Sequence, residues 1–368
     1  MSFNDHYDHA QLPSNSSETA IILCNLGTPE APTAPAVRRY LAQFLSDQRV
    51  VEIPRAIWLA LLHGIILRTR PAKTAAKYAS VWLPGGSPLM VWTQKQAVGL
   101  QALLQDSAAQ PPRVYYAMRY GQPSVESVLG QARADGAKRI FILPMYPQYS
   151  GTTTASLYDS WAAWSKQQRN LPDVRILSRY HDHPAYIAAL AAQVQAHWAQ
   201  HGRAQMLLLS FHGVPERNLQ LGDPYHCECL KTARLLAQAL GLEAGQWQAS
   251  FQSRFGKAKW VGPATDTTLA ALPARGIQSL DVFCPGFPTD CLETLEEIAI
   301  EGQEIFMHAG GSSYRYIPCM NDSAPWLAAL LRISQEQIGD WLRLPPANAA
   351  ALQEQAQLAQ AQKPAFHS

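Results

Sequence analysis

The sequence predicts an α/β protein built from two similar doubly wound, Rossmann-like domains, each with a four-stranded parallel sheet. Three observations lead to this prediction. Short apolar runs alternate with helical patterns along the chain, which is typical of βαβ units. Most of these runs are continuously apolar, as strands buried on both faces should be. Two motifs also recur in the same order in the two halves, which indicates a duplicated unit.

Eight segments are predicted as strands, and they divide naturally into two groups of four. In chain order they are residues 20–26, 113–119, 139–145, 174–180, 205–211, 247–253, 279–285 and 304–310. Helical patterns lie between them, for example at residues 92–106, 151–169, 184–201, 226–240, 265–275 and 322–334. The polar residues 1–17 and the Ala- and Gln-rich residues 344–368 show no core pattern, and we expect them to be tails.

Composition excludes several classes of protein. The 368 residues are 47% hydrophobic and 16% charged with a net charge of +2, as in a soluble globular protein. Lys and Arg are scattered, so nothing indicates nucleic-acid binding. Six irregularly spaced cysteines fit free thiols in a reducing compartment better than a disulfide framework. The N-terminus lacks the basic and apolar regions of a signal peptide, and we expect a cytoplasmic protein.

The longest apolar stretch, IPRAIWLALLHGIILR at residues 53–68, is too short for a bilayer span, which needs about 20 residues. Arg55, His63 and Gly64 interrupt it further. One interpretation is a buried helix. The other is an apolar lip around a greasy ligand or against a membrane surface.

The internal repeat consists of two pairs of strand ends. LCNLGTPE at 23–30 resembles LSFHGVPE at 209–216, and LPMYPQYS at 143–150 resembles CPGFPTDC at 284–291. Recurring Gly and Pro turn chemistry is the alternative explanation. In this alignment Leu26 stands where His212 stands, and Thr152 where Glu293 stands. Because ligands of open α/β sheets bind at the carboxyl ends of strands, we expect the chemistry to belong to the second half.

His212 ends an apolar run and precedes Gly213, which allows close approach of a ligand to the backbone. A neutral imidazole can accept a proton near pH 7 or bind a transition metal. Taken alone, a histidine that is merely hydrogen-bonded in the core is the more ordinary interpretation.

Three carboxylates, Glu293, Glu297 and Glu301, follow one another at intervals of four residues. On an α-helix they would drift by about 40° per step while sharing one flank, and a π-bulge would bring them closer to one line. Such a column could pass cations or protons between a site and solvent. A capping box formed by Asp290 and Glu293, or a solvated acidic face, are the structural alternatives.

The sequence HCEC, with His226, Cys227 and Cys229, resembles a metal-ligand set. On a helix, however, residues two apart point to different sides, and structural zinc or iron–sulfur sites use wider spacings and four ligands. We therefore expect a helix surface here.

Three basic residues and a tyrosine are candidate substrate anchors. Arg70 and Lys73 follow the apolar stretch, and Arg119 with Tyr120 ends the segment at 113–119. Each cation could pair with a substrate carboxylate, or be an ordinary surface charge.

At this point the chain resembles a known family. LLLSFHGVPERNLQLGDPY is similar to the ferrochelatase signature, in which an apolar strand leads into S-x-H-G-x-P and then G-D-P-Y. Seven further blocks occur in the family's order: CNLGTPE, RTRPAKTAAKY, GGSPLMVWTQKQ, MRYGQP, PMYPQYSGTTT, KWVGPATD and DCLETLEEI. The match runs from about residue 20 to residue 340. Each block alone is weak, but eight in sequence are very specific.

The resemblance implies a class II chelatase-like fold and the insertion of ferrous iron into protoporphyrin IX, the terminal step of haem synthesis. It also implies that residues 316–343 return to a first domain formed by residues 18–175, with residues 176–315 as the second domain. His212 and Glu293 match the family's catalytic and metal-contacting pair, and Glu297 and Glu301 match its outward acidic column. The substrate-binding positions implied are Leu26, Arg70, Lys73, Arg119, Tyr120 and Trp260.

The chain departs from animal members of the family in two places. Cys291 stands where they have a second histidine, and Gly151 stands where they have a cluster cysteine. We therefore expect no iron–sulfur cluster and no tightly bound cofactor, with Fe²⁺ acting as substrate.

The chemistry implied is the removal of two pyrrole protons as the metal enters. We hypothesise that His212 accepts a pyrrole proton, and that Glu293 guides iron or carries protons away through Glu297 and Glu301. Whether His212 binds the iron first stays open. The alternatives are a chelatase for coproporphyrin III or another metal, and a non-enzymatic porphyrin or haem carrier. The apolar lip and the poorly soluble product predict reversible contact with the inner face of a membrane.

Overall fold

Two four-stranded parallel sheets form the framework of the computed structural model, which describes residues 17–106, 110–256, 258–342 and 357. The first sheet contains β1 (Thr19–Gly27), β2 (Arg113–Tyr120), β3 (Arg139–Pro144) and β4 (Asp173–Ile176) in the order β2-β1-β3-β4. The second contains β5 (Met206–His212), β6 (Trp247–Gln252), β7 (Ser279–Phe283) and β8 (Ser313–Ile317) in the order β6-β5-β7-β8. The prediction of two similar α/β units with four parallel strands each is confirmed.

The helices between the strands also correspond in the two halves. Before the second strand of each sheet come α4 (Pro88–Gln105) and α9 (Tyr225–Ala239), and before the third come α5 (Val125–Ala134) and α10 (Thr265–Ala271) with the 3₁₀ turn η3 (Pro273–Arg275). Before the fourth strand, each half contains a π-helix that continues as an α-helix. These segments are η2 (Gly151–Ala155) with α6 (Ser156–Ser165), and η4 (Glu293–Gly302) with α11 (Gln303–His308).

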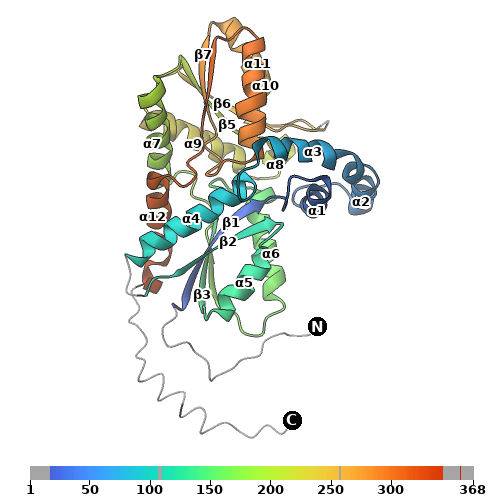
Figure 1. The fold of residues 1–368 in the computed structure, drawn as a ribbon, viewed down its shortest axis with the longest axis vertical. Helices are drawn as coiled ribbons and strands as arrows, with labels where there is room; N and C mark the ends of the chain where they lie inside the picture. Colours follow the sequence, from blue (N-terminus) through green and yellow to red (C-terminus); the bar gives the residue numbers. More distant parts are fainter. Residues whose placement is uncertain (1–16, 107–109, 257, 343–356, 358–368) are drawn as a thin grey trace.

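The last helix of each half crosses to the other half. Helix α7 (Pro184–His201) follows β4 of the first sheet but packs against α9 and β8, whereas α12 (Ala324–Leu342) follows β8 but packs against α4 and β3. The two helices also pack against each other, and both lie on the same side of the molecule in Figure 1. One buried apolar cluster therefore contains side chains of both sheets, including Leu23 of β1 and Leu209 of β5, together with Trp326 of α12.

The first half alone carries a long helical insertion after its first strand. This insertion, which we call the lip, contains α1 (Ala34–Leu45), α2 (Arg55–Leu61), the π-helix η1 (Leu62–Ile66) and α3 (Leu67–Val81). It projects sideways at the level where the two halves meet (Figure 1). The second half has only the short helix α8 (Glu216–Gln220) at the corresponding place.

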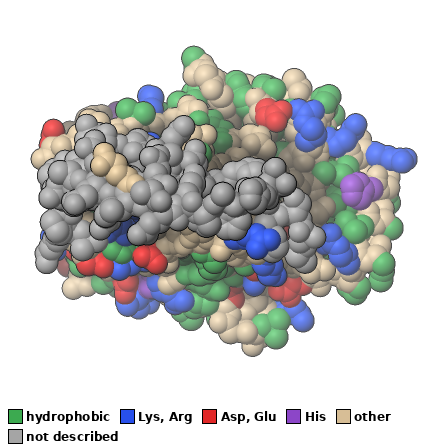
Figure 2. Space-filling model, turned by 90° about the horizontal axis from the view of Figure 1, so that it is seen from below, with side chains coloured by type: hydrophobic (Ala, Val, Ile, Leu, Met, Phe, Trp, Pro, Cys, Tyr) green, Lys and Arg blue, Asp and Glu red, His purple; other side chains and the backbone are tan. Residues whose placement is uncertain are grey.

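The apolar stretch at residues 53–68 forms the outer part of the lip, and it is not a buried helix. Ile57 is 66% exposed and Ile65 57% exposed, and Ile53 and Leu61 are exposed as well. Figure 2 shows exposed hydrophobic side chains interleaved with Lys and Arg at the edge of the molecule where Figure 1 places the lip. Of the two interpretations of this stretch, the exposed apolar lip is the one that the fold supports.

One predicted strand is wrong. Residues 304–310 continue the helix of η4 as α11, and the eighth strand is β8 at Ser313–Ile317. The apolar run Ile-Phe-Met fits a short helix with Phe306 buried as well as it fits a strand, so periodicity could not decide. The true strand lies at the edge of its sheet and contains Arg315, which pairs with Asp281 of β7, so it lacks the apolar signature of a central strand. The predicted tails at 1–17 and 344–368 lie outside the described residues, except for residues 17 and 357.

Candidate functional site

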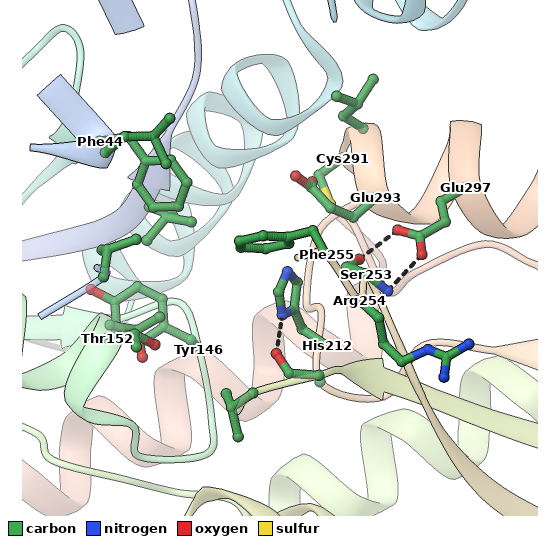
Figure 3. A pocket seen from close by; sticks show the side chains of 18 of the residues that line it. Phe44, Tyr146, Thr152, His212, Ser253, Arg254, Phe255, Cys291, Glu293 and Glu297 are labelled. Atoms are coloured by element: carbon green, nitrogen blue, oxygen red, sulfur yellow. Dashed lines mark hydrogen bonds between the residues drawn. The ribbon is translucent and has the colours of Figure 1, made fainter. Parts of the chain in front are cut away.

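A cavity of about 1190 Å³ lies between the two halves, beneath the lip. Its two walls differ in chemistry. Phe44, Tyr146 and Thr152 of the first half face one side of it, and His212, Glu293 and Glu297 of the second half gather on the other (Figure 3). His212, Glu293 and Glu297 therefore lie together on the second-half side of the cavity, opposite Phe44 and Tyr146.

His212 is held at the carboxyl end of β5 in a single ring orientation. Its Nδ1 lies 2.6 Å from the carbonyl oxygen of Gly213. Because a carbonyl oxygen can only accept, Nδ1 carries a proton in this contact, so in the neutral imidazole the lone pair is on Nε2. Figure 3 shows Nε2 pointing away from Gly213 into the cavity. A Cβ atom at residue 213 would lie 2.8 Å from the carbonyl oxygen of Gln252, so glycine is required there.

Glu293 begins the π-helix η4, and Gln252 fixes its backbone. The side-chain amide of Gln252 donates to the carbonyl oxygen of Glu293 over 2.8 Å, and its own oxygen accepts from Ser210 over 2.7 Å. The Glu293 carboxylate lies beside the thiol of Cys291. Burial first, and then the charge of Glu293, raise the pKa of that thiol well above its ordinary value. The thiol is therefore protonated at neutral pH and can donate to the carboxylate.

Glu297 is held by Ser253, the residue that follows β6. The backbone N–H of Ser253 donates to one carboxylate oxygen over 2.6 Å, and its hydroxyl donates to the other. Ser253 adopts a positive φ of 64°, which is unusual for a residue with a side chain and brings both donors to the same carboxylate. Burial raises the pKa of Glu297, against the opposing effects of the two Ser253 hydrogen bonds and of His212, while the Glu293 charge raises it further.

Glu301 does not contact Ser253, the partner of Glu297. It shares the ammonium of Lys77, on α3 of the lip, with the buried Glu296, at 2.7 and 2.8 Å respectively. All three residues line the cavity. The predicted acidic column thus exists on a π-helix, but Glu297 faces the loop after β6, whereas Glu301 faces the lip.

The alternative interpretation of Asp290 and Glu293 as a capping box is not supported. Asp290 accepts hydrogen bonds from the hydroxyls of Thr294 and Tyr316 and from the amide of Asn321. These contacts hold the start of η4 and leave Glu293 free for the cavity.

The predicted substrate residues divide into two groups. Leu26, Arg70 and Trp260 line the cavity, whereas the exposed Lys73 of α3, Arg119 and Tyr120 do not. Trp260 packs its ring 4.8 Å from that of Phe255, at the second-half edge of the cavity.

Arg119 and Tyr120 instead converge on one carboxylate of the lip. Each donates to Asp47 over 2.8 Å, and the hydroxyl of Ser156 donates to it over 2.6 Å. Burial acts to raise the pKa of Asp47, but the hydrogen bonds from Ser156, Arg49 and Tyr120, together with the charge of Arg119, lower it below its ordinary value. Asp47 lies just before the cavity-lining residues 49–53. Arg119 and Tyr120 therefore fix the base of the lip.

Sequence reasoning missed several cavity residues. Phe44, Arg49, Tyr146 and Phe255 come from the lip and from loops, where no periodic pattern singles them out. Lys77 lies in the segment RTRPAKTAAKY and Glu296 in DCLETLEEI, but in the sequence each looks like an ordinary charge on a helix surface. Only the juxtaposition of α3 with η4 joins them.

The HCEC segment lies on α9, away from the cavity. Cys227 is exposed while Cys229 is buried, so the prediction that they point to different sides is confirmed. His226 stacks on Phe251, with ring centroids 5.1 Å apart. The neighbouring Glu228 accepts from the backbone of Tyr149 over 2.7 Å and from Arg179 over 2.6 Å. The segment thus joins α9 to the turn after β3.

Among the described residues, no three His, Cys, Asp or Glu side chains are grouped closely enough to hold a metal ion. No described helix combines the length and the apolar character needed to cross a bilayer.

Comparison with known proteins agrees with this architecture. The ferrochelatase family profile matches residues 18–338. A ferrochelatase of Polaromonas sp. is 58% identical over 348 residues, covering 95% of both chains. A ferrochelatase of Methylibium petroleiphilum is 55% identical over 352 residues, covering 95% of this chain and 97% of its own. Among solved structures, SirB from Bacillus subtilis with Fe³⁺ is 14% identical with a TM-score of 0.50, covering 68% of this chain and 91% of its own, which shows a shared fold.

Proposed function

This chain belongs to the ferrochelatase family, and on that ground we propose that it is an enzyme that inserts ferrous iron into a porphyrin in haem synthesis, with release of two protons. The porphyrin in this proposal is protoporphyrin IX and the product is protohaem. The observation that carries the assignment of roles is the orientation of His212, which turns Nδ1 to the Gly213 carbonyl and Nε2 to the cavity at the end of β5.

The geometry supports His212 as the general base. The hydrogen bond to the Gly213 carbonyl keeps the proton on Nδ1, so the free lone pair of Nε2 can accept a pyrrole proton. When the imidazole becomes charged, the same carbonyl and the nearby carboxylate of Glu297 stabilise it. The electrostatic coupling between His212 and Glu297 therefore assists the first deprotonation.

The acidic side of the cavity fits the movement of cations. In our proposal Glu293 meets the incoming Fe²⁺ or the second pyrrole proton, since it is the carboxylate at the start of η4. Glu297 and Glu301 then pass charge toward solvent along the same helix. Carboxylate oxygens suit a divalent cation that must give up its water in steps, because they bind it without enclosing it.

The opposite wall fits a planar apolar macrocycle. Phe44, Trp58, Tyr146 and Leu26 provide apolar surface, and Arg49 and Arg70 provide cations that suit the carboxylates of a porphyrin. At about 1190 Å³ the cavity exceeds the usual size of pockets for small ligands, roughly 300–1000 Å³. A large ligand such as a tetrapyrrole is therefore the better match.

The test is anaerobic incubation of the protein with protoporphyrin IX and Fe²⁺, followed by the loss of porphyrin fluorescence. We expect a loss that depends on the protein. Binding of porphyrin without any loss would indicate a carrier and overturn the enzymatic proposal. Parallel reactions with coproporphyrin III, and with Co²⁺ or Zn²⁺, determine whether protoporphyrin and iron are preferred.

We also propose that the lip touches a membrane surface, on the inner face in a cytoplasmic setting. Ile57, Leu61 and Ile65 are exposed on its outer helices and Ile53 just before them, with Arg55 and Arg68 exposed among and after them. Exposed apolar side chains beside basic ones are typical of a helix that lies at an anionic lipid surface. Flotation with anionic vesicles should carry the wild type upward and leave the double variant Ile57→Ser, Ile65→Ser behind. Equal flotation of both proteins would contradict the proposal.

A further inference from the structure

Lys77 occupies the outer end of the acidic helix like a bound cation. Its ammonium lies 2.8 Å from Glu296 and 2.7 Å from Glu301. The Glu296 side chain is only 12% exposed, whereas the side chains of Lys77 and Glu301 are nearly half exposed. Burial raises the pKa of Glu296 and Lys77 opposes this, so the ammonium compensates a carboxylate that water reaches poorly.

The π-helix is what makes this contact possible. Glu296 and Glu301 are five residues apart, and on an α-helix they would point about 140° away from each other. In a π-helix the backbone repeats its hydrogen bonds from i to i+5, so residues five apart lie about one turn apart on the same flank. One lysine can therefore reach both carboxylates.

Lys77 also belongs to a different functional part of the cavity from its partners. It lies on α3, seven residues after Arg70, which lines the cavity at the rim. The contacts between α3 and η4 thus connect the lip, which faces the proposed porphyrin, with the helix that carries the proposed cation path. A change in the lip on one side would be transmitted to the carboxylates on the other.

We propose that Lys77 is a positioning residue that keeps the outer end of the acidic helix from retaining the metal substrate. This inference rests on the proposed iron insertion. Fe²⁺ can be held by Glu296 and Glu301 together only when the ammonium leaves, because the ammonium already occupies the space between them. Lys77 therefore prevents Glu296 and Glu301 from binding Fe²⁺ tightly, so the ion can move on toward the porphyrin. Because Lys77 belongs to the lip, the position of the lip affects how readily the metal enters.

The test is the variant Lys77→Met, which keeps an unbranched side chain of similar bulk and removes the ammonium and its charge. We expect the KM for Fe²⁺ and the dissociation constant for Mn²⁺, measured by electron paramagnetic resonance, to fall by about fivefold. The kcat should fall as metal release toward the porphyrin slows, while the KM for porphyrin stays unchanged. Lys77→Arg should behave like the wild type, and Lys95→Met, on α4 outside the cavity, is the charge-matched control.

A second variant keeps the test decisive if Lys77→Met is poorly folded. Lys77→Gln alone should bind Mn²⁺ more tightly than the wild type. Adding Glu296→Gln to it should abolish that gain. If the Lys77 variants show a lower Tm but unchanged Mn²⁺ affinity and unchanged KM for Fe²⁺, Lys77 only stabilises the fold and the inference is overturned. Because Mn²⁺ binding does not require turnover, this result is separate from a failure of the wild type to insert iron.

Discussion

At the carboxyl end of β1 the chain places Leu26, and at the matching end of β5 it places His212. The same contrast recurs where the π-helices begin, with Thr152 in the first half and Glu293 in the second. Both sheets have the same strand order. Met118 and Phe251 also make equivalent backbone contacts, since their N–H groups donate to the carbonyl oxygens of Pro123 and Pro263 respectively. The backbone is thus repeated, while the ionisable side chains are not.

A third pair shows what the first half does with the same positions. Two residues beyond these matching contacts stand Tyr120 and Ser253, and each bonds a side chain on the helix that follows the third strand. Tyr120 contacts Ser156 over 3.0 Å, and Ser253 donates to Glu297. The matching positions thus differ in role: in the first half the contact supports Asp47 and the lip, and in the second half it holds a carboxylate of the cavity.

The sharpest way to break this comparison is to remove His212. His212→Ala should lower the rate of iron insertion by about 10²- to 10⁴-fold, the usual contribution of a general base, while porphyrin binding measured by fluorescence quenching stays close to that of the wild type. The matched variant Leu26→Ala should change the rate only modestly and act mainly on porphyrin affinity. Comparable losses of kcat in both variants would mean that the chemistry is not confined to the second half.

The next largest effect is expected at the starts of the π-helices. Glu293→Gln keeps the shape but removes the charge, and it should lower kcat by roughly 10- to 100-fold, since a carboxylate that meets the metal or a proton is lost. Thr152→Val is the matched change on the opposite wall, and its kcat should stay within about twofold of the wild type. Steady-state assays with varied Fe²⁺ measure both. An unchanged kcat in Glu293→Gln would remove this residue from the proposed mechanism.

The sequence predicted the repeated framework and that His212 ends a buried strand, because buried parallel strands and strand-end motifs leave a strong local pattern. It placed His212 at the end of β5, where its neighbours are mainly local in the chain. It could not predict β8, since an edge strand with Arg315 lacks that pattern. Nor could it find Lys77, whose partners lie more than 200 residues away and depend on the winding of η4.

The family resemblance implies that Arg119 binds substrate, but Arg119 does not line the cavity. Its guanidinium is bonded to Asp47 and Ser156 instead. If Arg119 acts by holding the lip, Arg119→Met and Asp47→Asn should raise the KM for porphyrin by a similar factor, about three- to tenfold, with little change in kcat. If it binds the porphyrin directly, only Arg119→Met should do so. Kinetics with varied porphyrin separate the two outcomes.

The smallest expected effect is the most specific to the comparison, because the carboxyl groups of Asp47 and Glu297 should change stability with pH in opposite directions. Asp47 has a lowered pKa, so its folded-state contacts stabilise the protein above the ordinary carboxyl pKa and lose that effect as the pH falls. Glu297 has a raised pKa, so ionising it costs stability as the pH rises through the interval between its ordinary and its folded value.

Two variants isolate these opposite contributions. Ser156→Ala weakens the hydrogen bonding of Asp47, so its Tm should fall below that of the wild type at neutral pH, and the deficit should shrink in acid. Glu297→Gln cannot ionise, so its Tm relative to the wild type should rise with pH over the same range. Both differences should be small, on the order of 1–3 °C. Thermal unfolding between pH 4 and 8 measures these differences. Only pKa shifts of opposite direction give Tm differences that change with pH in opposite directions. The same trend in both variants would therefore contradict the contrast between Asp47 in the first half and Glu297 in the second.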